Sequence, residues 1–135
     1  MTPGDRKDLI LYRLERAKST LKEVNLLVEN NLLNTAVNRL YYSCYYAVHA
    51  ILLSHDLAPQ THSGIRHQFG LHFIKTGLID KELGKYFSDI FDKRQSGDYS
   101  DFIEFTESEV LSLISPAKKL ITSIEDYLNN NFLNE

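Results

Sequence analysis

The chain has 135 residues, with 15 Lys and Arg against 18 Asp and Glu, which gives a formal charge of −3 at pH 7. This balance argues against a module that coats nucleic acid through an overall basic surface, but it leaves room for a local basic groove. The length predicts one domain, residues 1–135, that buries a hydrophobic core without needing disulfides or metals.

The first predicted helix spans about residues 3–29. Its apolar positions recur in alternating steps of four and three, which places them on one helical face. They are Ile10, Leu14, Ala17, Leu21, Val24 and Val28. The opposite face is charged and includes Arg13 and Arg16. Thr2, as an N-cap ahead of a first-turn proline and an early acid, starts the helix, and two asparagines after residue 29 stop it.

A second helix is predicted from about residue 33 to 55. One stripe consists of Val37, Leu40, Tyr41, Cys44, Val48 and Ile51. The other side carries Ser43, Ala47 and Ala50, small residues that let another backbone approach closely. This helix should therefore be covered on more than one side. We expect a dimer seam here, formed by these small residues together with Tyr42 and Tyr46.

Residues 57–60 interrupt the helical pattern, and a short third helix follows. Ser63 can cap this helix, which reaches Lys75 before Gly77 supplies a stop. Asp80 then reads as the N-cap of a fourth helix that Gly97 ends. The fourth helix has an apolar stripe that continues into an arginine: Leu83, Phe87, Ile90, Phe91 and Arg94.

A capping box starts the fifth helix, because Thr106 is followed three residues later by Glu109. Its apolar stripe is Val110, Leu113, Ala117, Leu120, Ile124 and Tyr127. Pro116 should kink this helix, since proline lacks an N–H donor and crowds the preceding turn. No segment shows sustained strand alternation. The prediction is an all-α, up-and-down four-helix bundle with an additional short helix.

The arrangement of histidines, carboxylates and glycines in the sequence does not indicate a metal or cofactor site. No Glu is followed three places later by His, as dinuclear sites in bundles require, and His62, His67 and His72 step by five and share no helical face. No catalytic triad order or phosphate-binding glycine loop is present. We expect neither a metal nor a cofactor. His49, four residues after Tyr45, is expected to be a hydrogen-bonded core histidine.

Two segments stand out as candidate sites. Residues 38–47 contain Arg39 and four tyrosines, whose rings beside a guanidinium can stack a base or hold a phosphate; the alternative is a tyrosine-rich core and dimer face. Residues 94–99 read Arg-Gln-Ser-Gly-Asp-Tyr. An arginine at the end of an apolar stripe needs an anion, either Asp98 in a structural pair or a ligand.

Four blocks, in their order and spacing, resemble the small prokaryotic HEPN domain proteins over nearly the whole chain. The blocks are residues 38–50, 61–64, 72–77 and 94–99. The resemblance implies a bundle of four to five helices that commonly dimerises. It also implies a toxin–antitoxin partnership with a minimal nucleotidyltransferase. In ribonuclease members an arginine holds the phosphate, and a histidine four to six residues later moves protons for attack by the ribose 2′-hydroxyl.

The chain departs from that pattern after Arg94, where the corresponding positions are Tyr99, Ser100 and Asp101. Tyrosine titrates near pH 10 and is a poor proton shuttle at neutrality. Arg66 and His72 have a matching spacing, which we interpret as chance. The hypothesis is a non-catalytic or weakly catalytic homodimeric partner of a nucleotidyltransferase-like protein.

The hypothesis places a nucleotide- or RNA-phosphate-binding groove at the dimer. The candidate groove residues are Arg94, Asp98, Tyr99, Arg39, Tyr42, Tyr46, His49 and His62. One alternative is a metal-independent ribonuclease toxin that uses Arg94 with His49 or His62. The other is a purely structural interaction module.

The expected location is the cytoplasm. The single Cys44 cannot form an internal disulfide and is expected to be packed rather than reactive. No apolar run approaches the ~20 residues that a membrane span needs, and the charged N-terminal segment lacks the hydrophobic core of a signal peptide.

Overall fold

The computed structural model describes residues 1–99 and 103–133, with Tyr99 described by its backbone. Every regular element in these ranges is helical, which confirms the all-α prediction. The elements are α1 (Pro3–Glu29), α2 (Leu33–Ser54), α3 (His62–Phe69), the π-helical turn η1 (Gly70–Ile74), α4 (Lys81–Tyr99), α5 (Glu107–Leu128) and the π-helical turn η2 (Asn129–Leu133).

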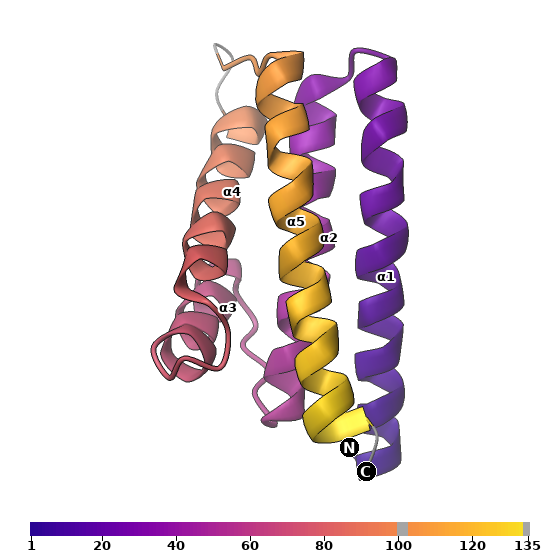
Figure 1. Ribbon diagram of the computed structural model, residues 1–135, viewed down its shortest axis with the longest axis vertical. Helices are drawn as coiled ribbons and strands as arrows, with labels where there is room; N and C mark the ends of the chain where they lie inside the picture. The colour runs from indigo at the N-terminus through magenta and orange to yellow at the C-terminus, as the bar shows by residue number, and fades with distance from the viewer. Residues whose placement is uncertain (100–102, 134–135) are drawn as a thin grey trace.

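The four long helices α1, α2, α4 and α5 run alongside one another in alternating directions, and α3 lies at one end of the bundle (Figure 1). Helix α2 packs against α1, α3, α4 and α5, so it is the central element. The start of α1 and the turn η2, which follows α5, lie at the same end of the bundle (Figure 1). This is the predicted up-and-down bundle with a short extra helix.

Local capping chemistry sets the start of α1 and of α5. The amide of Asp5 donates to Thr2 Oγ1 at 3.1 Å, and the amide of Glu109 donates to Thr106 Oγ1 at 3.1 Å. In both cases the acid accepts from the cap amide in return, which completes a capping box. Both predicted helix starts are confirmed.

The third helix begins earlier than the sequence pattern predicts. Thr61, not Ser63, is the N-cap, and its Oγ1 accepts from the amide of Gly64 at 2.9 Å. The reason is conformational, because Thr61 is extended whereas Ser63 already lies within the helix. The chain then continues through η1, and Gly77 has a φ of +79°, in the left-handed region where the stop was expected.

The prediction that Gly97 ends the fourth helix is wrong, because α4 continues to Tyr99. The glycine serves packing instead of termination. A Cβ atom at position 97 would lie 2.9 Å from Cε2 of the Phe105 ring, closer than a side chain tolerates. Gly97 therefore lets the buried Phe105 lie against α4.

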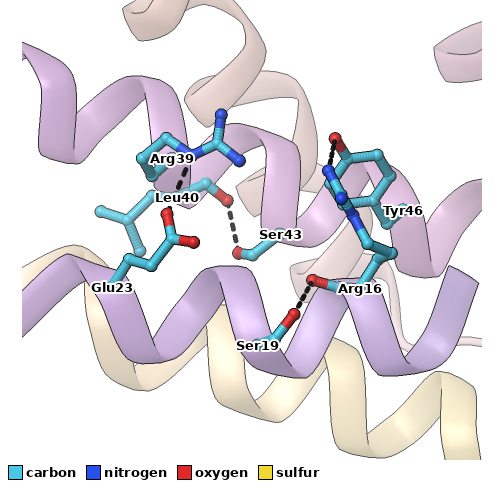
Figure 2. A network of polar contacts seen from close by, with 7 residues as sticks. All are labelled: Arg16, Ser19, Glu23, Arg39, Leu40, Ser43 and Tyr46. Atoms are coloured by element: carbon cyan, nitrogen blue, oxygen red, sulfur yellow. Dashed lines mark hydrogen bonds and ion pairs between the residues drawn. The ribbon is translucent and has the colours of Figure 1, made fainter.

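The predicted dimer seam through Ser43, Ala47 and Ala50 is also wrong. All three residues are completely buried within the chain itself. Ser43 lies between α1 and α2 and donates to the carbonyl of Leu40 at 2.7 Å (Figure 2). The small side chains serve the close packing of the chain's own helices, so no second copy can reach them.

Three further features match or refine the sequence analysis. Cys44 is buried, and this burial raises the pKa of its thiol to about 12, so the thiol is packed as expected. Helix α5 continues through Pro116 without ending there. Among the described helices, none combines the length and the apolar character that crossing a membrane requires.

Candidate functional site

Three half-buried tyrosines form a continuous row on one face of α2: Tyr42, Tyr45 and Tyr46. Their ring centroids lie 5.7 Å apart for Tyr42 and Tyr45, 5.8 Å for Tyr45 and Tyr46, and 6.1 Å for Tyr42 and Tyr46. These are ordinary distances for interacting aromatic rings. Behind this tyrosine row Tyr41 is fully buried, so one part of the tyrosine-rich segment is core and another part is surface.

Arg94 lies at one end of the tyrosine row. Only 11% of its side chain is exposed, because the apolar stripe of α4 packs toward α2 and carries the arginine with it. Its Nη2 donates to the hydroxyl of Tyr42 at 3.2 Å. The guanidinium carbon lies 5.4 Å from the ring centroids of both Tyr41 and Tyr42, within cation–π range.

Asp98 forms an ion pair with Arg94, which was one of the two alternatives that the sequence left open. The Arg94 Nε lies 2.9 Å from Asp98 Oδ2, and Asn38 Nδ2 donates to the same carboxylate oxygen at 3.1 Å. The carboxylate therefore has partners on both α2 and α4. The side chain of Tyr99, a predicted groove residue, lies outside the described part of the molecule.

His62, at the first turn of α3, joins this cluster from a distant part of the chain. Its Nδ1 lies 2.8 Å from the hydroxyl oxygen of Tyr41, and its ring lies 4.8 Å from that of Tyr45. Burial, and next the positive charge of Arg94, lower the pKa of His62. Burial raises the pKa of Tyr41, so the phenol keeps its proton at neutral pH. We call Arg94, Asp98, Tyr41, Tyr42 and His62 the Arg94 cluster.

His49 lies toward the other end of the tyrosine row. Its ring stacks on Tyr45 with centroids 6.1 Å apart, and burial followed by the charge of Arg13 lowers its pKa. The expectation of a hydrogen-bonded core histidine is wrong for Nδ1, which is buried without a hydrogen-bond partner among the described residues. The imidazole stacks on Tyr45 instead, close enough to Arg13 to feel its charge.

Arginines from α1 surround the last tyrosine of the row. Arg16 Nη2 donates to the hydroxyl of Tyr46 at 3.0 Å (Figure 2). The guanidinium carbons of Arg16 and Arg13 lie 5.0 Å and 5.9 Å from the Tyr46 ring centroid. From the sequence, both arginines were assigned only to the charged face of the first helix, and their contact with Tyr46 was missed. Their spacing of three on one face was the available signal, but it does not reveal which helix that face meets.

Arg39, another predicted groove residue, is half-buried beside the tyrosine row. Its guanidinium carbon lies 5.7 Å from the Tyr42 ring centroid, and its Nε lies 3.4 Å from Glu23 Oε2 on α1 (Figure 2). Arg66, whose spacing to His72 we interpreted as chance, pairs with Asp92 at 3.3 Å and lies over the Phe91 ring. It takes no part in the tyrosine row.

The arrangement combines guanidinium groups, imidazoles and partly exposed aromatic rings. Guanidinium groups bind phosphate through paired N–H donors, and tyrosine faces stack on nucleobases. Within the described residues, no cluster of three or more His, Cys, Asp or Glu side chains could hold a metal ion.

Comparison with known proteins shows which family the chain belongs to. The family model of the HEPN domain matches residues 10–127. A UPF0332 protein of Thermotoga maritima is 37% identical over 94% of this chain and 96% of its own length. Two proteins of Methanocaldococcus jannaschii bear the name "Putative toxin". One is 33% identical over 85% of this chain and 78% of its own length, and the other is 32% identical over 92% of both.

Proposed function

Because the chain belongs to the HEPN domain family, we propose that it is a toxin-like HEPN protein whose Arg94 cluster binds the phosphate of RNA or of a nucleotide. It acts as a homodimer, with the cluster in the groove between the copies, and as the partner of a nucleotidyltransferase-like protein. The observation that carries the proposal is the position of Arg94. This nearly buried guanidinium lies against two tyrosine rings and near His62, at the edge of a partly exposed aromatic row.

A phosphate can take the place of Asp98 in front of Arg94. Asp98 lies in the last turn of α4, and 28% of its side chain is exposed. It keeps Asn38 as a hydrogen-bond donor when it moves away from the arginine. Asp98 thus balances the guanidinium charge in the absence of ligand, which avoids an uncompensated buried charge.

The test measures the affinity for a short single-stranded RNA and for adenosine monophosphate at two salt concentrations, in the wild type, Arg94→Ala and Arg94→Lys. A phosphate contact predicts weaker binding in the alanine variant, and a salt slope that is shallower by about 0.7 for a single strand. Lysine should rescue binding only in part, since it keeps the charge but loses the planar donor pair.

Arg6→Ala is the matched control, because Arg6 also combines an ion pair, with Asp56, and an aromatic contact, with the Phe132 ring, but lies away from the Arg94 cluster. This variant should bind like the wild type. Equal affinity in all four proteins rejects the groove, and the chain is then a structural interaction module.

A second candidate function is a metal-independent ribonuclease toxin, and the position of His62 favours it over a purely structural role. His62 would take the proton of the ribose 2′-hydroxyl as the O2′–P bond forms. It would return the proton to the 5′-oxygen as the P–O5′ bond breaks, with Arg94 on the phosphate. The first proposal predicts no appreciable turnover of a fluorescence-quenched RNA. Chelator-resistant turnover that is lost in His62→Ala and Arg94→Ala, and growth arrest on expression alone, would establish the ribonuclease instead.

A further inference from the structure

We propose a second anion site at the far end of the tyrosine row, formed by Arg13, Arg16, Tyr46 and His49. Together with the Arg94 cluster it holds successive phosphates of one single-stranded RNA. The inference rests on the proposed function, because it extends the same binding surface. It specifies the substrate as an oligonucleotide strand rather than a mononucleotide.

The first argument is the chemistry of this end. Arg16 is exposed and lies across the Tyr46 ring, and Arg13 approaches the same ring from the preceding turn of α1. Arg13 Nε and His49 Nδ1 are both buried, and neither has a hydrogen-bond partner among the described residues. Buried polar atoms without partners are costly, so two of them, one on Arg13 itself and one on His49, indicate a place that a ligand completes.

The second argument is continuity between the two sites. Tyr42 and Tyr46 are one helical turn apart, and Tyr45 lies against His62 on one side and against His49 on the other. Each end of the row therefore carries arginine and histidine, with aromatic rings between them. Phosphates at the two ends and bases on the rings match the way single strands are bound, largely without regard to sequence.

The third argument is charge. The chain as a whole carries −3, yet four arginines border the row, and among the described residues ion pairs join two of these arginines to acids. The arginines are Arg13, Arg16, Arg39 and Arg94, and the acids are Glu23 and Asp98. A local positive surface on an acidic protein attracts a polyanion, and the partly exposed aromatic rings favour RNA over an acidic peptide.

The experiment compares a 2′-O-methyl uridine hexamer, which cannot be cleaved by 2′-hydroxyl attack, with uridine monophosphate. The test protein is Arg13→Gln/Arg16→Gln, and Arg6→Gln on the same helix is the matched control, since Arg6 pairs with Asp56 away from the row. We expect the double variant to bind the hexamer roughly tenfold more weakly. Its salt slope should be shallower by about 0.7 for each phosphate that the protein no longer neutralises. Its affinity for uridine monophosphate should equal that of the wild type.

A third protein, Tyr46→Leu, tests the stacking step. It keeps the apolar bulk but loses the aromatic face, so hexamer binding should weaken roughly tenfold with an unchanged salt slope. Melting temperatures measure whether each variant keeps its fold, and light scattering measures whether it keeps its oligomeric state.

The outcomes separate this inference from the proposed function. If the double variant matches Arg6→Gln with the hexamer, the second site is overturned, while an Arg94-dependent mononucleotide affinity still supports the proposed function. If Arg94→Ala leaves both ligands unaffected but the double variant weakens the hexamer, the proposed function fails and the second anion site stands. If the double variant or Tyr46→Leu lowers the mass of the particle but binds the hexamer like the wild type, the row is a self-association face and the RNA assignment is overturned.

Discussion

Arg94 is nearly buried and forms an ion pair with Asp98, so its removal should change the free energy of unfolding measurably. The guanidinium is 11% exposed, and its partner Asp98 is one helical turn further along α4. When one member of a partly buried pair is removed, the other loses its compensation. We predict that Arg94→Met and Asp98→Asn couple by about 1 kcal/mol in a double-mutant cycle. The measurement is the free energy of unfolding in urea, without ligand; additive single effects would contradict a structural contribution of the pair.

Two glycines differ sharply in the space around them. A Cβ atom at Gly84 would lie 2.7 Å from Cγ1 of Ile74, whereas one at Gly70, which has helical backbone angles, would meet nothing within 4 Å. Gly84→Ala should therefore destabilise the protein by about 1–3 kcal/mol through overpacking. Gly70→Ala should leave stability unchanged or raise it by about 0.4–1 kcal/mol. Urea denaturation of the two variants checks this, and similar effects at both positions would refute it.

At the scale of elements, the small side chains of α2 allow the neighbouring helices to pack close to it. Ala47 is fully buried, so a larger side chain there must push packed helices apart. We predict that Ala47→Leu lowers the free energy of unfolding by about 1–3 kcal/mol. Thr35→Leu, at an exposed position of α2, is the control and should have little effect. A variant as stable as the wild type but with a smaller mass in light scattering would restore the rejected dimer seam.

At the scale of the whole molecule, we expect a homodimer. The family resemblance implies one, and helix α1 leaves the apolar surface of Leu11 (45% exposed) and Tyr12 (54% exposed) to solvent. Light scattering at micromolar concentration measures the mass directly. A monomer would contradict both the dimer and the groove between two copies.

Stability should depend on pH through the histidines. Burial is the main cause that lowers the pKa values of His49, His55 and His62 in the folded state, so the unfolded chain binds protons more readily. The stability that these neutral histidines contribute to the folded state is fully present above the unfolded histidine pKa of about 6.5. It is lost as the pH falls below that value, because the unfolded chain then takes up protons first. We predict that the melting temperature falls between pH 7 and pH 5.

A histidine variant checks that cause. His49→Gln/His62→Gln should show a shallower decline of the melting temperature over this range than the wild type. His67→Gln, which replaces an exposed histidine, should follow the wild type. If the melting temperature of the double variant declines as steeply as that of the wild type, the pH dependence comes from carboxylates and not from these histidines.

The sequence by itself determined the elements and the local contacts of the chain. Apolar periodicity and capping depend on residues within a turn or two, so the bundle and the Thr2 and Thr106 caps were predictable. The Arg94–Asp98 pair was one of two alternatives that the sequence left open. The pattern was wrong at two positions. Two neighbouring hydroxyl residues could cap α3, and Thr61 rather than Ser63 does so. Gly97 does not end α4; it leaves space for Phe105, a contact that the local sequence does not show.

Only the tertiary structure decided which faces meet. The rotation of one helix against another brings His62 to the Arg94 cluster, places Arg16 on Tyr46, and buries Ala47 within the chain instead of at a dimer seam. These residues are far apart in sequence, and helical periodicity states which side chains share a face but not what that face packs against. The tyrosine row was therefore visible in the sequence, whereas its arginine and histidine neighbours at both ends were set by packing.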